Sequence, residues 1–161
     1  MQTLMRAFFL SVLLAPGALL AAGGGGGGGA SGATSTRPSD PVVERATQAM
    51  LQENWVSAQA LLKEVISRNP DDAEYHNLYA YSLRKGPNPD MSLVFKHYNE
   101  ALRLDPKHRG ANEYLGEAYL MVNNLPKARE QLATLDKICF LPCREYTELK
   151  KSIADYEAKP R

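Results

Sequence analysis

The sequence has few of the features that mark nucleic-acid-binding chains. Its formal net charge is only +1, from 19 basic and 18 acidic side chains. No run of Lys and Arg is longer than the pairs Arg84-Lys85 and Lys150-Lys151. A protein that binds nucleic acid is expected to gather basic residues on one face. The balanced and dispersed charge therefore argues against that class.

Motifs of the common enzyme classes are also missing. There is no Gly-x-Ser-x-Gly and no His-x-x-x-His. The seven consecutive glycines at 23–29 are followed by neither the Lys nor the helix of a phosphate-binding loop. His76, His97 and His108 lie far apart in the sequence, and none has an Asp or Ser partner at a catalytic spacing. We predict no catalytic residue, no metal site and no cofactor, and we expect that the chain is not an enzyme.

The start of the chain resembles an export signal. Arg6 precedes an apolar stretch that Pro16-Gly17 interrupts and that ends in small residues at 21–23. This order is typical of a secretory signal peptide, and the stretch is shorter than the roughly 20 residues of a membrane span. We interpret residues 1–22 as a signal peptide, with an uncleaved membrane anchor as the alternative. The prediction is a periplasmic or secreted protein that has no membrane span after cleavage.

Residues 23–40 are rich in Gly and Ser, a composition that cannot bury a core and is typical of a flexible linker. The folded domain is therefore predicted at 41–158. Strand signals are absent from it, since neither period-2 alternation nor an Asn-Gly turn occurs. Apolar residues instead recur at helical spacing. They predict helices at 41–53, 55–68, 72–85, 91–104, 107–122, 125–137 and 144–158.

The helical patterns repeat along the chain. A small residue on the first helix of each pair (Ala46, Ala80, Gly116) precedes a residue on the second helix (Ala58, Val94, Ala128) by 12, 14 and 12 positions. The two extra residues of the middle pair fall where the turn 86–89 reads Gly-Pro-Asn-Pro. The insertion therefore lies in a turn and leaves the helices in register.

These repeats resemble the tetratricopeptide repeat, abbreviated TPR. The third repeat carries the pattern most clearly, as Leu115-Gly116-x-x-Tyr119 followed by Ala128 and Leu132. The resemblance implies an all-α, right-handed α-solenoid of about three helix pairs, at about 41–72, 73–108 and 109–142. A C-terminal capping helix at about 144–158 completes it. We expect Ala80 and Gly116 to sit where the two helices of one repeat cross closely.

The two cysteines stand in the segment Cys139-Phe-Leu-Pro-Cys143. In an exported chain an even number of cysteines favours a disulfide, and Pro142 bends the chain between the two. We predict a Cys139–Cys143 disulfide that pins the capping helix to the third repeat. A redox-active pair and a copper(I) site, which soft thiolates suit, are the alternatives.

In the TPR family the first helices line a concave groove, and the resemblance implies the same here. The mixed polar and apolar character of these positions suits an extended peptide or a helix, although an ordinary wetted surface is the alternative. The positions that correspond to the family's carboxylate clamp hold no cation, so that activity is not transferred. The predicted groove residues are Thr47, Met50, Asn77, Tyr81, Arg84, Glu113, Glu117 and Leu120.

The predicted function is therefore a protein–protein interaction module or scaffold in the cell envelope. Its partner would be another protein, exported or envelope-associated, held in the concave groove. The chain resembles small exported bacterial TPR proteins that end in a cysteine pair. The alternative function is a thiol or copper(I) carrier that uses Cys139 and Cys143.

Overall fold

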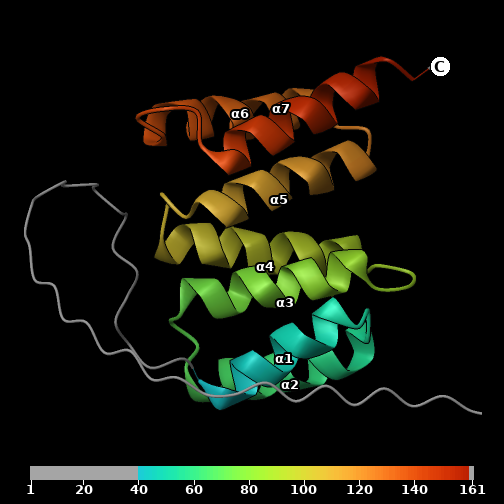
Figure 1. Ribbon diagram of the computed structural model, residues 1–161, viewed down its shortest axis with the longest axis vertical. Helices are drawn as coiled ribbons and strands as arrows, with labels where there is room; N and C mark the ends of the chain where they lie inside the picture. The colour runs from blue at the N-terminus through green and yellow to red at the C-terminus, as the bar shows by residue number, and fades with distance from the viewer. Residues whose placement is uncertain (1–39, 160–161) are drawn as a thin grey trace, which may run out of the picture. The chain divides into compact units, whose positions relative to one another are not determined.

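Helices account for nearly all of the described chain. The computed structural model describes residues 40–159, and within that range there is no strand. The helices are α1 (Pro41–Leu51), α2 (Trp55–Arg68), α3 (Ala73–Lys85), α4 (Met91–Leu104), α5 (Arg109–Met121), α6 (Leu125–Ile138) and α7 (Arg144–Glu157) (Figure 1). The predicted all-α fold is confirmed. The predicted signal peptide and most of the predicted linker lie outside the described residues.

Side-chain caps define where the helices begin. Asp or Asn stands at the N-cap of five helices, where its side-chain oxygen accepts a backbone N–H of the first turn. In α5 the imidazole of His108 takes that role and accepts the N–H of Ala111 at 3.1 Å. The helix therefore begins at Arg109, two residues later than predicted. Helix α1 ends at Leu51 and α5 at Met121, where the predicted ends were 53 and 122. In each case a residue with positive φ follows, Glu53 at 56° and Asn123 at 59°, and such a residue cannot continue the helix.

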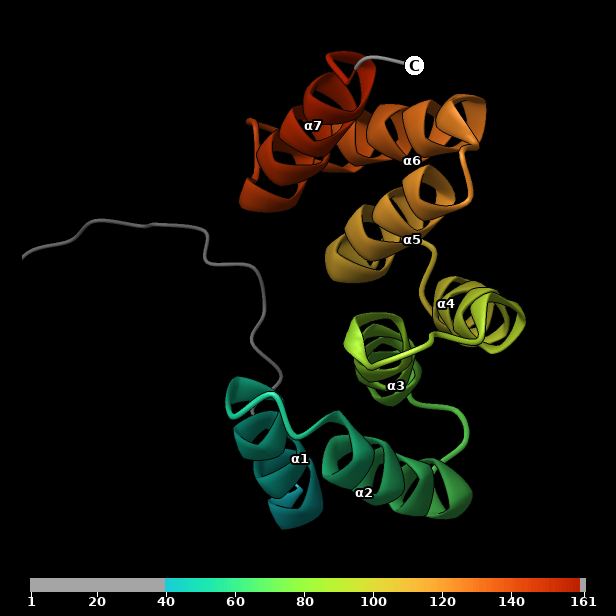
Figure 2. The same ribbon diagram turned by 90° about the vertical axis from the view of Figure 1, so that its right-hand side faces the viewer.

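The helices form two layers. In Figure 2, α1, α3, α5 and α7 follow one another along one side, and α2, α4 and α6 along the other. We call the first set the inner layer. Each helix packs on its neighbours in sequence, and α3 with α5 and α5 with α7 also touch directly. This is the arrangement of an α-solenoid, as predicted.

The core consists of three apolar clusters, and each cluster draws on three consecutive helices. The first lies between α1 and α2 and is covered by side chains of α3. The second joins α3, α4 and α5 around the fully buried Tyr98. The third joins α6 and α7 with side chains of α5. No helix pair buries its apolar face alone, so stability depends on the stacking of neighbouring pairs.

Gly116 allows a close approach, but the neighbour differs from the predicted one. A Cβ atom at Gly116 would lie 2.5 Å and 2.7 Å from the two Cδ atoms of Leu149 on α7. The tightest contact is therefore with the capping helix and not with α6 of the same repeat. Leu149 is fully buried and has no space to retreat. The glycine is needed because α7 packs onto α5 at this point.

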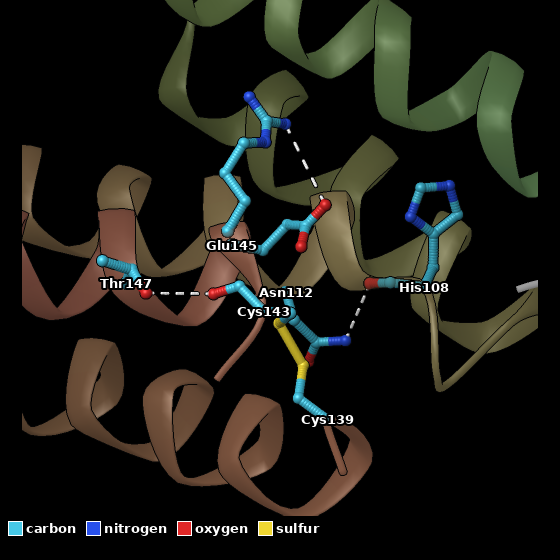
Figure 3. Close-up of a disulfide and its surroundings, with 7 residues drawn as sticks. His108, Asn112, Cys139, Cys143, Glu145 and Thr147 are labelled. Carbon is cyan, nitrogen blue, oxygen red and sulfur yellow. Dashed lines mark hydrogen bonds and ion pairs between the residues drawn. A yellow bond between two sulfur atoms is a disulfide. The ribbon is translucent and has the colours of Figure 1, made fainter. Parts of the chain in front are cut away.

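A disulfide closes the turn between α6 and α7. Cys139 is the C-cap of α6 and Cys143 the N-cap of α7, and their Cα atoms are 5.8 Å apart (Figure 3). The structure thus joins the two sulfurs as predicted, at the base of the capping helix. The enclosed Phe140 and Leu141 are exposed, with Phe140 fully so. The disulfide therefore fixes α7 without adding to the core.

We predict that Gly116→Ala destabilises the protein by about 1–3 kcal/mol, because the new methyl group overpacks the buried contact with Leu149. Gly110→Ala is the matched control on the same helix. There a Cβ would meet its nearest atom at 3.5 Å, an ordinary contact, so the change should not destabilise the protein. Urea unfolding followed by circular dichroism measures both. Equal effects of the two substitutions would contradict the close-contact explanation.

Candidate binding groove

The inner layer carries an apolar hollow between α1, α3 and α5. It measures about 230 Å³ and offers mostly carbon atoms to a ligand. Leu51 at its edge is 75% exposed. We call it the apolar hollow, and its lining residues are Thr47, Met50, Leu51, Leu78, Tyr81 and Tyr114.

A buried arginine packs against two of the aromatic rings that line this hollow. The guanidinium of Arg84 lies over the rings of Tyr81 and Tyr114, 5.6 Å and 5.5 Å from their centres. Its Nη2 atom is 2.7 Å from Oε2 of Glu117, and its Nε donates to the hydroxyl of Tyr98 at 3.3 Å. Burial alone would lower the pKa of Arg84, but Tyr98 and Glu117 raise it overall. Arg84 is therefore charged, and it connects α3, α4 and α5.

A second, polar hollow lies on the other side of the same ion pair, between α3, α5 and α7. It measures about 360 Å³. The hydroxyl of Ser152 on α7 donates to Oε1 of Glu117 at 3.3 Å, so the capping helix is part of the wall. We call it the polar hollow, and its lining residues are Arg84, Glu117, Leu120, Met121, Ser152, Asp155, Tyr156 and Lys159.

Six of the eight predicted groove residues line these two hollows. Thr47, Met50 and Tyr81 belong to the apolar hollow, and Arg84, Glu117 and Leu120 to the polar one. Asn77 and Glu113 line neither hollow and are each only 4% exposed. A groove residue is expected to be open to a partner, and four of the eight are not. Met50, Asn77, Arg84 and Glu113 are buried, because packing between neighbouring helices of both layers covers them.

The contribution of α7 was not predicted from the sequence. The segment was interpreted as a capping helix with one apolar and one wetted face. The structure places it in the inner layer, so that Ser152, Asp155 and Lys159 lie beside α5 in the polar hollow. The available signal in the sequence was the helical spacing of Tyr146, Leu149 and Ile153. It predicts that one face of the helix is buried, but not the layer in which the helix lies.

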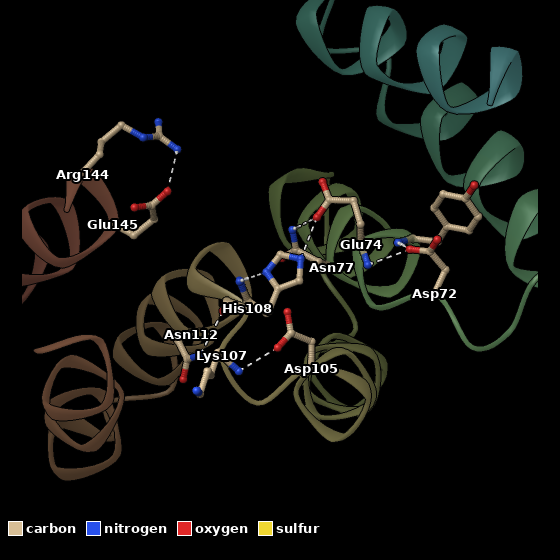
Figure 4. A network of polar contacts seen from close by, with 11 residues as sticks. Asp72, Glu74, Asn77, Asp105, Lys107, His108, Asn112, Arg144 and Glu145 are labelled. Atoms are coloured by element: carbon tan, nitrogen blue, oxygen red, sulfur yellow. Dashed lines mark hydrogen bonds and ion pairs between the residues drawn. The ribbon is translucent and has the colours of Figure 1, made fainter. Parts of the chain in front are cut away.

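Polar contacts hold α3 and α5 together at the start of the groove (Figure 4). Nε2 of His108 lies 2.8 Å from Oε2 of Glu74, and the same oxygen accepts Nδ2 of Asn77 at 3.1 Å. Burial alone would lower the pKa of His108, but Glu74 raises it overall. Glu74 and His108 are 34 positions apart. Their pairing was invisible in the sequence because it requires the stacking of two repeats.

His76 and His97 also meet, between α3 and α4. Their Nδ1 atoms are 2.8 Å apart, and Nε2 of His76 contacts the carbonyl oxygen of Pro70 at 2.7 Å. Since the carbonyl only accepts, Nε2 of His76 carries a hydrogen, and its Nδ1 accepts from His97 when both rings are neutral. Burial, then the charge of His76, lowers the pKa of His97 to about 4. The pair is a polar link inside the second repeat.

The described chain offers no ready metal or thiol site. Among residues 40–159, no three His, Cys, Asp or Glu side chains are grouped so as to hold a metal ion. Both cysteines are engaged in the disulfide. Over the same range, no helix is long and apolar enough to cross a membrane.

Comparison with known proteins identifies the family. The model of the tetratricopeptide repeat matches residues 43–90 and 96–138, more than half of the chain. The chain belongs to the tetratricopeptide repeat family. No curated protein matches the TPR chain over its sequence.

Several solved structures share the fold. The TPR2B domain of yeast Sti1, in a complex with pHsp70, superposes with a TM-score of 0.61 at 22% identity, covering 72% of this chain and 98% of that one. The translocator chaperone SycD of Yersinia enterocolitica type III secretion gives 0.61 at 14% identity, with coverages of 71% and 85%. A chain of the CopN-Scc3 complex superposes with a TM-score of 0.58 at 19% identity. The match covers 71% of this chain and 65% of that one.

Glu113 is the most perturbed acid of the groove region. Burial, and then the charge of Glu117, raises the pKa of its carboxyl to about 7, although Arg144 opposes the shift. The folded chain therefore holds this proton more tightly than the unfolded chain does. Stability linked to Glu113 is fully present below the ordinary carboxyl pKa and is lost as the pH rises through about 7.

We predict that Glu113→Gln raises the free energy of unfolding at pH 8 by about 1–3 kcal/mol and changes it little at pH 4.5. The neutral amide removes the cost of a buried charge at the higher pH. Urea unfolding at both pH values measures the difference. Glu64→Gln, on the exposed face of α2, is the control and should change stability by less than about 0.5 kcal/mol at either pH. A gain that is the same at both pH values would contradict the assignment.

Proposed function

We propose that this TPR chain is a protein-interaction module that holds an extended or helical segment of a partner protein along its inner layer. The main support is the pair of hollows on α1, α3, α5 and α7. Arg84 lines the polar hollow and lies against Tyr81 and Tyr114 of the apolar one. One offers apolar carbon and aromatic rings, and the other offers charged and hydroxyl groups. A peptide segment with alternating apolar and polar side chains fits such a surface.

The relatives support this proposal. The solved structures that share the fold include a domain in complex with pHsp70, a secretion chaperone and a chain of the CopN-Scc3 complex. Catalysis is not proposed, because the inner layer offers no Ser, Thr or Cys nucleophile hydrogen-bonded to a histidine base among the described residues. The thiol or copper(I) carrier is not proposed either, because it requires reduction of the disulfide and a third ligand.

We further propose that the module acts in the cell envelope or outside the cell. The signal-like start of the sequence and the cysteine pair support this location. Intact-mass analysis of the protein from the envelope or medium should show loss of residues 1–22 and a mass two hydrogens below that of the reduced form. Retention of the full N-terminus in a soluble cytosolic fraction, or two free thiols in the native protein, would contradict this location.

Site-specific photocrosslinking tests the groove. A benzoylphenylalanine at Thr47, which is exposed and lines the apolar hollow, should crosslink to a partner protein. The same residue at Glu64, exposed on α2 of the outer layer, should not. Thr47→Arg should weaken capture at least fivefold by filling the hollow, while circular dichroism remains unchanged.

Tyr81→Ala is the second variant, because it removes one ring from beside Arg84. It should weaken capture as well, and its urea unfolding curve shows how much of the loss comes from reduced stability. Crosslinks from Glu64 but not from Thr47 would move the binding surface to the outer layer and would contradict the proposal.

A further inference from the structure

Two buried oxygen atoms of the inner layer have no hydrogen-bond donor. Among the described residues, the buried side-chain atoms without a partner are Oδ1 of Asn77 and Oε2 of Glu113. Oδ1 of Asn77 is an acceptor, and Oε2 of Glu113 is one when the carboxyl group is ionised. Both residues lie on inner helices, α3 and α5. A buried acceptor left without a donor destabilises the folded state, and each such group in a native protein calls for an explanation.

The orientation of Asn77 is fixed by its neighbour. Its Nδ2 donates to Oε2 of Glu74 at 3.1 Å. If the amide were turned over, its oxygen would face that carboxylate oxygen and the hydrogen bond would be lost. Oδ1 therefore remains the unsatisfied atom. Nδ2 also lies 3.5 Å from the Cβ position of Gly110, one helical turn before Glu113 on α5.

The surroundings of Glu113 carry an excess of negative charge. Glu117 on α5 and Glu145 and Glu148 on α7 all act on its carboxyl, and Arg144 is the cation that opposes them. Arg84 from α3 is bound to Glu117 at 2.7 Å. Arg144 in turn lies 3.9 Å from Oε1 of Glu145, so both guanidinium groups already pair with other carboxylates. A ligand that brings positive charge and N–H donors would complement both the charge and the unsatisfied acceptors.

We call the region of Glu113, Glu117, Glu145 and Glu148, between α3, α5 and α7, the acidic seam. We propose that it receives a Lys or Arg side chain of the partner segment, with Glu113 as the carboxylate that pairs with it. The inference rests on the proposed function and specifies the chemistry of the occupant. An acidic segment is excluded, because it would add a further carboxylate to the four.

Binding requires a small movement of one side chain. Oε2 of Glu113 is covered in the free protein, so the carboxyl group turns toward the seam when the cation arrives. The turn breaks no hydrogen bond of that oxygen, because it has none. The arriving cation favours the carboxylate form, and the proton that Glu113 held passes to the buffer. Proton release is thus a signature of this site.

Fluorescein-labelled tetra-arginine amide is the probe, and tetra-citrulline amide, which has nearly the same shape without charge, is its matched control. Fluorescence anisotropy with the full chain at pH 7 should show at least tenfold tighter binding of tetra-arginine, and no binding of tetra-glutamate. Glu113→Gln should weaken tetra-arginine binding at least fivefold. Glu64→Gln, which removes one charge from the exposed face of α2, should leave it unchanged.

Isothermal titration calorimetry in phosphate and in Tris measures the released protons, because the two buffers differ in heat of ionisation. The wild type should release a fraction of a proton per bound tetra-arginine at pH 7, and Glu113→Gln should release none. A purely structural role for Glu113 would not produce that difference.

Three results would overturn the inference: no binding of tetra-arginine at millimolar concentration, equal binding of tetra-arginine and tetra-citrulline, or equal affinity of the wild type and Glu113→Gln. The photocrosslinks from Thr47 report on the proposed function separately. If they persist while any of these results is found, the groove binds a partner by other chemistry. If they fail while tetra-arginine binding depends on Glu113, the acidic seam stands and the wider groove does not.

Discussion

The ion pair of Arg84 and Glu117 is the interaction on which the inner layer depends. A buried ion pair stabilises a protein only when its remaining donors and acceptors are satisfied. Here Tyr98 and Ser152 supply the additional contacts, and two tyrosine rings cover the guanidinium. Four helices, α3, α4, α5 and α7, thereby meet at one charged centre. The apolar and polar hollows are the two sides of that centre, so the same contacts that hold the repeats together also shape the candidate groove.

The helices and their order could be predicted from the sequence because their signals are local. Prolines, the Gly-Pro-Asn-Pro turn and Asp or Asn caps mark the ends, and apolar spacing marks the buried faces. The errors at the ends were local as well. The imidazole cap of His108 moved the start of α5, and a left-handed residue at Glu53 shortened α1. Histidine is not among the preferred N-cap residues, and glutamate rarely adopts a left-handed conformation.

The site was less predictable, because it depends on distances between helices. The repeat pattern placed Thr47, Tyr81 and Glu117 on the correct layer. It could not show that Asn77 and Glu113 are covered by neighbouring helices, or that Arg84 is enclosed by aromatic rings. The pairs Glu74–His108 and His76–His97 arise only when repeats stack and helices cross. The sequence holds the residues, but their burial is a property of the assembled solenoid.

The position of α7 has a consequence for how the groove responds to its surroundings. Among the described residues α7 is the last helix, and it packs against α5 and α6. This helix is fixed to the third repeat by the Gly116–Leu149 contact at its centre and by the disulfide at its first residue. Any ligand that contacts Asp155 or Lys159 depends on how firmly α7 is held. If reduction of the Cys139–Cys143 disulfide loosens α7 and weakens binding in the polar hollow, a ligand in that hollow stabilises the disulfide by the same free energy.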